Sequence, residues 1–300
     1  MNAPIDLRRL AAMWPPRLDR DVDIVSVVNT SPDSYFAGSV TTEVAAAVAA
    51  ARLHIQQGAH FIEIGGVSGG SAAERVNEDI ELARTVPFVE AIAAEFPQVT
   101  VTIDTYRPKV AEAALAVGAR AINDVTAMHF AQSEMADLAA QHQVPVFLMH
   151  LEGPGGHAGR KLNRPRYNDV VGQIKGFFIE RIETLTAAGI AKDQIVIDVG
   201  LGAGKRPFHD YELLASLHEF SKLGVAQMSA CSRKQLVQAV SPVPPDQRLG
   251  GSIVASMWSV IAGGCRYLRV HEVQPYAQML DVWDAIAQQV DAACAPELGM

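Results

Sequence analysis

The sequence predicts a single-domain α/β protein folded as a (β/α)8 TIM barrel, and three observations support this. The chain has 300 residues, of which 49% are hydrophobic and 19% charged, so it can bury a large core. Short apolar runs alternate with longer alanine-rich segments along the whole chain. About eight such strand–helix units are present, which suits a barrel at this chain length.

The expected strands are near-continuous apolar runs, the pattern of parallel strands that are covered on both faces. In chain order they are 22–28, 60–64, 99–103, 121–122, 144–149, 194–197, 225–228 and 267–270. The expected helices between them are 43–57, 77–96, 108–117, 133–141, 169–188, 210–217, 249–262 and 276–292. Glycine closes many of these helices just before the next strand, as at helix C-caps: Gly58, Gly118, Gly189, Gly224 and Gly264.

An open, doubly wound sheet is the alternative to a barrel. It would concentrate polar residues at one switch point, whereas here they follow almost every strand, so we prefer the barrel. We expect an N-terminal extension over residues 1–21, the barrel over 22–292 and a C-terminal tail over 293–300. We expect residues 152–166, rich in Gly, Arg and Pro, to form a long loop.

Charge and composition exclude several classes of protein. The 25 basic and 33 acidic residues give a net charge of −8, which argues against a nucleic-acid partner. Cys231, Cys265 and Cys294 lie far apart without metal-type spacing, so a reducing compartment is favoured over a disulfide scaffold. No export signal or membrane span is expected, because residues 1–20 lack an apolar core and the apolar stretch 253–265 is short. A cytoplasmic location follows.

Polar side chains at the strand ends are expected to converge on one mouth of the barrel, where active sites of this fold lie. Four of them point to a flat heterocyclic ligand: Asp104, Asn123, Asp198 and Lys234. A carboxylate facing an amidine-like edge accepts two parallel hydrogen bonds, so Asp198 with Asn123 suits such a ring.

A phosphate or pyrophosphate group is the second ligand feature that the strand ends predict. Positive charge for it would come from Arg233, Lys234, Arg269 and His271. Asn29 could give a neutral oxygen to a hydrated Mg²⁺ that is bound partly through the phosphates. Gly200, Gly202 and Gly204 form a glycine-rich loop, which leaves a nucleotide cofactor as an alternative, although Lys205 interrupts the dinucleotide fingerprint.

In order and spacing, the motifs at these strand ends resemble those of the dihydropteroate synthase family of pterin-binding barrels, over about residues 22–290. The matching segments are 29–35, 104–105, 123–124, 148–150, 198–205, 232–234 and 269–272. The resemblance implies a transferase of folate biosynthesis that joins 7,8-dihydropterin-6-ylmethyl diphosphate to 4-aminobenzoate and releases pyrophosphate. It also implies a cytoplasmic homodimer with Mg²⁺ as cofactor.

The resemblance also implies a role for each matching residue. The pterin would be bound by Asp104, Asn123, Met149, Asp198 and Lys234, of which Asp104 and Lys234 would be catalytic. The diphosphate would be bound by Asn29, Arg269 and His271, with Asn29 also facing the metal. The arylamine would be bound by Ser68 and Ser232.

Three departures from the family pattern fall in the second and sixth loops. In segment 67–72 only Ser68 of the family's Ser-Thr-Arg survives, Ala203 replaces an aromatic residue, and Val199 replaces a proline. Two of these changes affect the acceptor side. A pterin-binding paralogue that lacks synthase activity, or that uses another amine, is therefore the second hypothesis. A pterin-dependent methyltransferase is the third, and the absence of a corrinoid-binding segment in these 300 residues counts against it.

Overall fold

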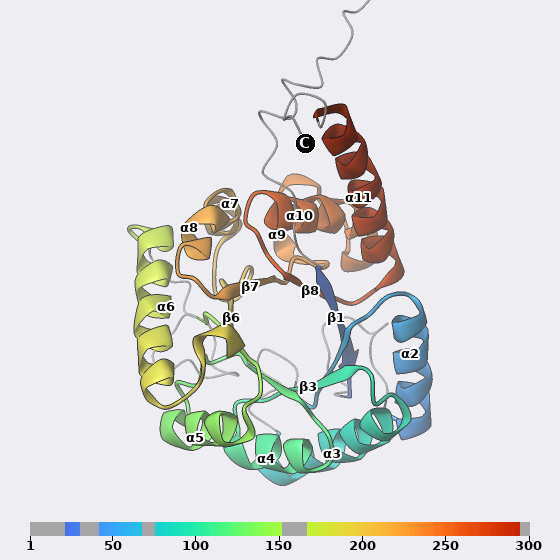
Figure 1. Ribbon diagram of the computed structural model, residues 1–300, viewed down its shortest axis with the longest axis vertical. Coiled ribbons are helices and arrows are strands. Elements are labelled where there is room, and N and C mark those ends of the chain that lie inside the picture. The colour runs from blue at the N-terminus through green and yellow to red at the C-terminus, as the bar shows by residue number, and fades with distance from the viewer. Residues whose placement is uncertain (1–21, 31–41, 68–75, 152–166, 295–300) are drawn as a thin grey trace, which may run out of the picture.

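The computed structural model describes residues 22–30, 42–67, 76–151 and 167–294, and it confirms the predicted barrel. Eight strands pair in parallel and in chain order, and β1 closes the barrel against β8. The helices form an outer ring around the strands (Figure 1). Residues 1–21 and 295–300, which include most of the predicted extension and tail, lie outside the described residues.

The strands begin and end close to the predicted positions, but several extend further at their C-terminal ends. They are β1 (Asp23–Asn29), β2 (Phe61–Gly65), β3 (Thr100–Asp104), β4 (Ala121–Asp124), β5 (Val146–Met149), β6 (Ile195–Asp198), β7 (Ala226–Ser229) and β8 (Tyr267–Val270). Parallel pairing continues to the polar residues, since Asp104 pairs with Asn123 and Met149 with Asp198. These polar residues therefore belong to the C-terminal ends of the strands rather than to the loops.

The outer helices are longer or shorter than predicted by only a few residues, with two exceptions. They are α2 (Val44–Gln56), α3 (Glu78–Glu95), α4 (Pro108–Ala116), α5 (Gln132–His142), α6 (Val170–Ala187), α7 (Pro207–Ala215), α8 (Leu217–Ser221), α9 (Gln235–Val240), α10 (Leu249–Ile261) and α11 (Gln274–Cys294). The predicted helix 210–217 was wrong in extent, because the chain there forms α7 and α8 with a break at Ser216. Helix α7 starts early because Pro207 presets the first helical residue. The short α9 was not predicted.

The five predicted glycine caps are confirmed, because each glycine has a φ between 67° and 115°. Only glycine takes this left-handed conformation without a steric cost, so the helices end where the sequence indicates.

Strand alternation divides the core into two parts. Outward residues of the strands pack against the helices, whereas Val25, Ala121, Phe147, Val196 and Met228 form a separate cluster of inward residues. The rings of Phe61, Phe147 and Tyr267 meet edge to face, with centroids 5.1–6.0 Å apart. This apolar layer fills the N-terminal part of the barrel, and the polar residues occupy the C-terminal part.

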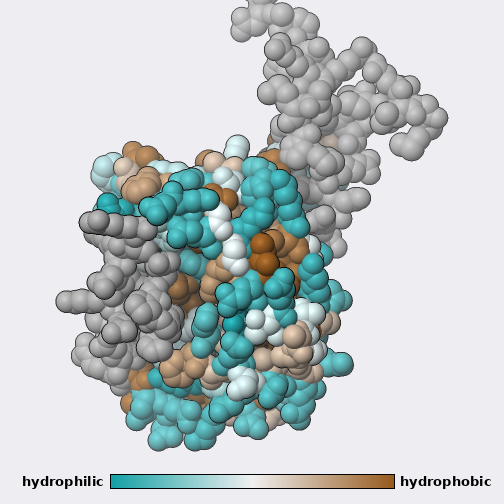
Figure 2. All heavy atoms as spheres, turned by 90° about the vertical axis from the view of Figure 1, so that its left-hand side faces the viewer, coloured by the Kyte–Doolittle hydropathy of each residue, from teal (hydrophilic) through white to brown (hydrophobic). Residues whose placement is uncertain are grey.

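The outer surface is mostly hydrophilic on the face that carries α6, with scattered hydrophobic side chains (Figure 2). None of the helices in the described part of the chain is both long and apolar enough to cross a membrane.

Candidate active site

The candidate site lies at the C-terminal ends of the strands, where the inward residues change from apolar to polar. On β2, β4, β6 and β8 the inward apolar residue is followed two positions later by Glu63, Asn123, Asp198 or Arg269. Asp104 ends β3 beside Asn123, and Met149 ends β5 beside Asp198. Four predicted ring-binding residues therefore lie at or next to the ends of neighbouring strands.

Glu63 links two of the predicted residues. Its carboxylate is 1% exposed and accepts a hydrogen bond from Nε of Arg269 at 2.7 Å and one from Nδ2 of Asn123 at 2.9 Å. The guanidinium of Arg269 also donates through Nη2 to Glu63 and, at 3.2 Å, to Asp104. Glu63 was not singled out from the sequence. The sequence could have indicated it, because Glu63 is the only charged residue of β2 and stands at an inward position.

Asp104 is a carboxyl group held among other acids. Burial and the charge of Glu63 raise its pKa to about 8, against the opposing effect of Arg269. Gly65 lies next to this side chain, since a Cβ there would be in ordinary van der Waals contact with Oδ2 of Asp104, at 3.5 Å. Burial lowers the pKa of Arg269, but Glu63 and Asp104 outweigh it and keep this guanidinium charged.

The loop after β6 is built around Lys205 rather than around a nucleotide phosphate. The Lys205 ammonium donates to the carbonyl oxygens of His150 at 3.1 Å, Gly200 at 2.9 Å and Ala203 at 3.3 Å. Nδ1 of His150 also lies 3.1 Å from this ammonium and can only accept from it, so the three N–H groups are shared among four acceptors. Burial and the charge of Lys205 lower the pKa of His150 to about 3. Oδ1 of Asp198 accepts the Gly200 N–H at 2.8 Å, so the same loop fixes this carboxylate.

Lys234 lies beside this loop. Its ammonium donates to the carbonyl oxygen of Leu201, and its methylene groups contact Gly202, where a Cβ would lie 3.3 Å from Cδ of the lysine. Burial lowers its pKa, whereas the charge of Asp198 raises it. Lys234 and Asp198 thus interact electrostatically across the loop, as expected for residues of one site.

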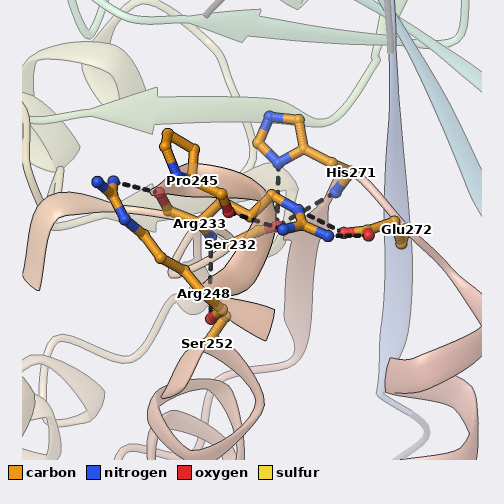
Figure 3. A network of polar contacts seen from close by, with 7 residues as sticks. All are labelled: Ser232, Arg233, Pro245, Arg248, Ser252, His271 and Glu272. Carbon is orange, nitrogen blue, oxygen red and sulfur yellow. Dashed lines mark hydrogen bonds and ion pairs between the residues drawn. The ribbon is translucent and has the colours of Figure 1, made fainter. Parts of the chain in front are cut away.

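The turn before Lys234 is held by the network in Figure 3. Arg233 has a φ of 57°, and its N–H donates to Oγ of Ser252 at 2.8 Å. Its guanidinium donates to Glu272 at 2.8 Å through Nε and to the carbonyl oxygen of Pro245 at 2.7 Å. The sequence predicts that Arg233 offers its charge to a phosphate, whereas in the structure an ion pair with the partly exposed Glu272 engages this side chain and holds the turn before Lys234.

His271 and Ser232 contact each other at the edge of this turn. Oγ of Ser232 lies 2.9 Å from Nδ1 of His271 and accepts its backbone N–H at 3.4 Å. Burial and the charges of Arg269, Lys234 and Arg233 lower the pKa of His271 to about 3. Burial and these cationic neighbours favour the neutral ring, so in the structure His271 contributes a hydrogen-bonding contact with Ser232, whereas the sequence predicts a positive charge from it.

The remaining predicted residues are Asn29 and Ser68. Asn29 ends β1 opposite Gly65, at the same end of the barrel as the other site residues. Ser68, with the rest of segment 68–75, lies outside the described residues. Among the residues that the structure places, no three His, Cys, Asp or Glu side chains could hold a metal ion together. The protein side of a metal site at Asn29 would therefore be a neutral amide oxygen.

Comparison with known proteins agrees with this geometry. The model of the family described as "Pterin binding enzyme" matches residues 25–271. The dihydropteroate synthase of Escherichia coli (strain K12) is 34% identical over 87% of this chain and 90% of its own length, and that of Synechocystis sp. is 34% identical over 88% and 89%.

Solved structures give the same result. The Xanthomonas albilineans dihydropteroate synthase with 4-aminobenzoic acid has a TM-score of 0.80 at 36% identity, covering 90% of this chain and 94% of that chain. The Yersinia pestis enzyme with a sulfonamide drug has a TM-score of 0.83 at 33% identity, covering 91% and 96%. The chain therefore belongs to the dihydropteroate synthase family of pterin-binding enzymes.

Proposed function

We propose that the protein is a dihydropteroate synthase of folate biosynthesis. It joins 7,8-dihydropterin-6-ylmethyl diphosphate to 4-aminobenzoate and releases pyrophosphate. One observation carries the proposal: hydrogen-bond acceptors for a flat ring and a charged arginine lie together at one barrel mouth, in a chain whose relatives include a dihydropteroate synthase with bound 7,8-dihydropteroate.

The pterin would lie among Asp104, Asn123, Met149, Asp198 and Lys234. Asn123 is 3% exposed and Asp198 is 2% exposed, so water competes little for hydrogen bonds between these two side chains and a bound ring. Hydrogen bonds between these acceptors and the ring N–H groups would reject ligands that lack those donors. Lys234 would donate to a ring acceptor, as the only ammonium among these five.

The diphosphate would contact Arg269, His271 and Asn29. Arg269 stays charged and presents a rigid set of N–H donors, and His271 contributes a neutral hydrogen bond. Asn29 would hold Mg²⁺ together with the phosphates, since this ion keeps several waters and needs few protein ligands. When bound, Mg²⁺ neutralises charge on the leaving pyrophosphate.

The reaction needs no protein nucleophile. The bond between the pterin methylene carbon and the diphosphate oxygen breaks, and the arylamine nitrogen attacks that carbon and then loses a proton. Positive charge develops on the pterin as pyrophosphate leaves, and Asp104, when ionised, would stabilise it. Ser232, with Ser68, would contact the arylamine. We place this reaction in the cytoplasm and in a homodimer.

The proposal is tested by incubating the purified protein with MgCl₂, the dihydropterin diphosphate and 4-aminobenzoate. Formation of one dihydropteroate for each pyrophosphate released supports the synthase. Tight binding of the dihydropterin without product formation would instead favour a pterin-binding paralogue. Product formation only with another arylamine would show that the acceptor differs.

A further inference from the structure

Glu63 is buried inside the barrel on β2, and its two carboxylate oxygens serve different partners. Oε1 accepts from Nε of Arg269 at 2.7 Å, and Oε2 accepts from Nδ2 of Asn123 at 2.9 Å. Under the proposed function these partners contact different parts of the substrate, because Asn123 faces the pterin ring and Arg269 faces the diphosphate. Glu63 thus connects the two halves of the site without itself being exposed.

The contact with Glu63 determines which way the Asn123 amide points. A carboxylate only accepts hydrogen bonds, so the amide must turn its NH₂ group toward Glu63. Its oxygen, Oδ1, is then buried and has no hydrogen-bond partner among the described residues. A buried acceptor without a partner is costly, and a ligand N–H at this point would remove the cost. The site therefore presents an acceptor, and not a donor, to the ring.

The same carboxylate fixes one edge of the Arg269 guanidinium. Both Nε and Nη2 donate to Oε1 of Glu63, and Nη2 also reaches Asp104. Because a guanidinium is planar, holding this edge fixes the direction of its other N–H donors.

We propose that Glu63 is a positioning residue, which keeps Asn123 as an acceptor for the pterin ring and aims Arg269 at the diphosphate. This inference rests on the proposed function, because it takes a dihydropterin diphosphate as the ligand. Glu63 contacts neither half of the substrate and acts only through its two neighbours.

The test is a cycle of variants at Glu63 and Asn123, with binding measured by calorimetry. The probes are the dihydropterin alcohol, which lacks the diphosphate, and inorganic pyrophosphate. In Glu63→Gln the new amide carries one acceptor and one donor, so it cannot accept from both neighbours. We expect Kd for the alcohol to rise about tenfold or more, because Asn123 turns its NH₂ toward the ring. Pyrophosphate affinity should fall as well, since Arg269 loses part of its support.

The double variant Glu63→Gln/Asn123→Asp moves the negative charge from position 63 to its hydrogen-bond partner at position 123. The glutamine amide can then donate to the new carboxylate and still accept from Arg269, and the second oxygen of that carboxylate faces the ring as an acceptor. We expect the double variant to bind the alcohol more tightly than either single variant does. Asn123→Asp alone should bind it weakly, because two carboxylates face each other.

Glu81→Gln is the matched control. Glu81 is also 1% exposed and pairs with an arginine, Arg107, but it lies on α3 outside the barrel. This variant should keep the affinity for the alcohol within about twofold. If Glu63→Gln does not fold, the inference is tested by comparing the double variant with Asn123→Asp alone. Tighter binding of the alcohol by the double variant would support it.

Unchanged affinity of Glu63→Gln for both probes would overturn the inference and leave the synthase intact. Additive losses in the double variant would also overturn it. Wild-type protein that binds the alcohol but forms no dihydropteroate would overturn the synthase, while the cycle would still measure the role of Glu63. Absence of any binding by the wild type would contradict both.

Discussion

Oδ2 of Asp104 lies 3.2 Å from Nη2 of Arg269, and the same guanidinium is shared with Glu63. One positive charge therefore faces two carboxyl groups, of which Glu63 is buried and Asp104 is partly buried. Because it cannot fully compensate both, burial and Glu63 raise the pKa of Asp104 to about 8. Asp104 is therefore mostly protonated at neutral pH, and ionising it inside the folded site costs stability.

The first prediction follows from this raised pKa. A carboxyl group with a pKa near 3.8 when unfolded and about 8 when folded stabilises the fold at low pH, and this contribution is lost as the pH rises to about 8. Asp104→Asn should therefore melt like the wild type at pH 4, and be more stable by at least about 1 kcal/mol at pH 8. Thermal melting from pH 4 to pH 9 checks this. The control is Asp137→Asn on the exposed side of α5. A stability difference that does not change with pH would contradict the prediction.

The second prediction concerns Asp198. Removing its carboxylate leaves ring N–H groups and the Gly200 N–H without an acceptor, so Asp198→Ala should weaken binding of the dihydropterin alcohol about 100-fold. Calorimetry measures the affinity. Asp193→Ala, at an exposed position just before β6, is expected to bind like the wild type. Equal affinity of the two variants would mean that the ring is bound elsewhere.

The third prediction concerns the buried ammonium of Lys205. Lys205→Met keeps an unbranched side chain that is one atom shorter, and it leaves the carbonyl oxygens of His150 and Gly200 without their donor. We expect a loss of about 3 kcal/mol in the free energy of unfolding, measured by urea denaturation. Lys192→Met, at an exposed position, should change stability little. If both variants unfold at the same urea concentration, Lys205 does not hold the loop together.

The fourth prediction separates backbone strain from steric overlap at two glycines. Gly264 has a φ of 67° with nothing within 4 Å of an added Cβ, so Gly264→Ala should cost only about 1 kcal/mol. Gly200 has a φ of 70°, but an added Cβ would lie 2.1 Å from the carbonyl oxygen of His150. Gly200→Ala should therefore destabilise the protein by about 3 kcal/mol or more beyond the loss in Gly264→Ala. It should also move Asp198. Similar losses in the two variants would show that the loop can shift to accommodate the methyl group.

Much of the fold could be predicted from the sequence because local signals agree with it. Apolar runs marked the strands, and Gly58 and Gly118 marked the ends of their helices. The break at Ser216 and the short α9 were missed, because neither has a strong periodic pattern and both depend on packing. The strand ends were placed too early for a similar reason, since pairing with neighbours, not hydrophobicity, carries Asp104 and Asp198 into the sheet.

The site was predictable in its residues but not in its charges. Strand order brings Asn123 and Asp198 to one end of the barrel, which the sequence could indicate. The neutral state of His271 and the ion pair of Arg233 with Glu272 depend on burial and on contacts between distant segments. A sequence does not reveal those contacts, so both residues were expected to act as cations.

A crystal structure of the protein with 7,8-dihydropteroate tests the central claim most directly. We expect ring N–H groups within about 3.2 Å of Oδ1 of Asn123 and of the Asp198 carboxylate, with the Glu63–Asn123 contact unchanged. A pterin ring bound outside the barrel mouth, or one that presents an acceptor to Asn123, would contradict the account.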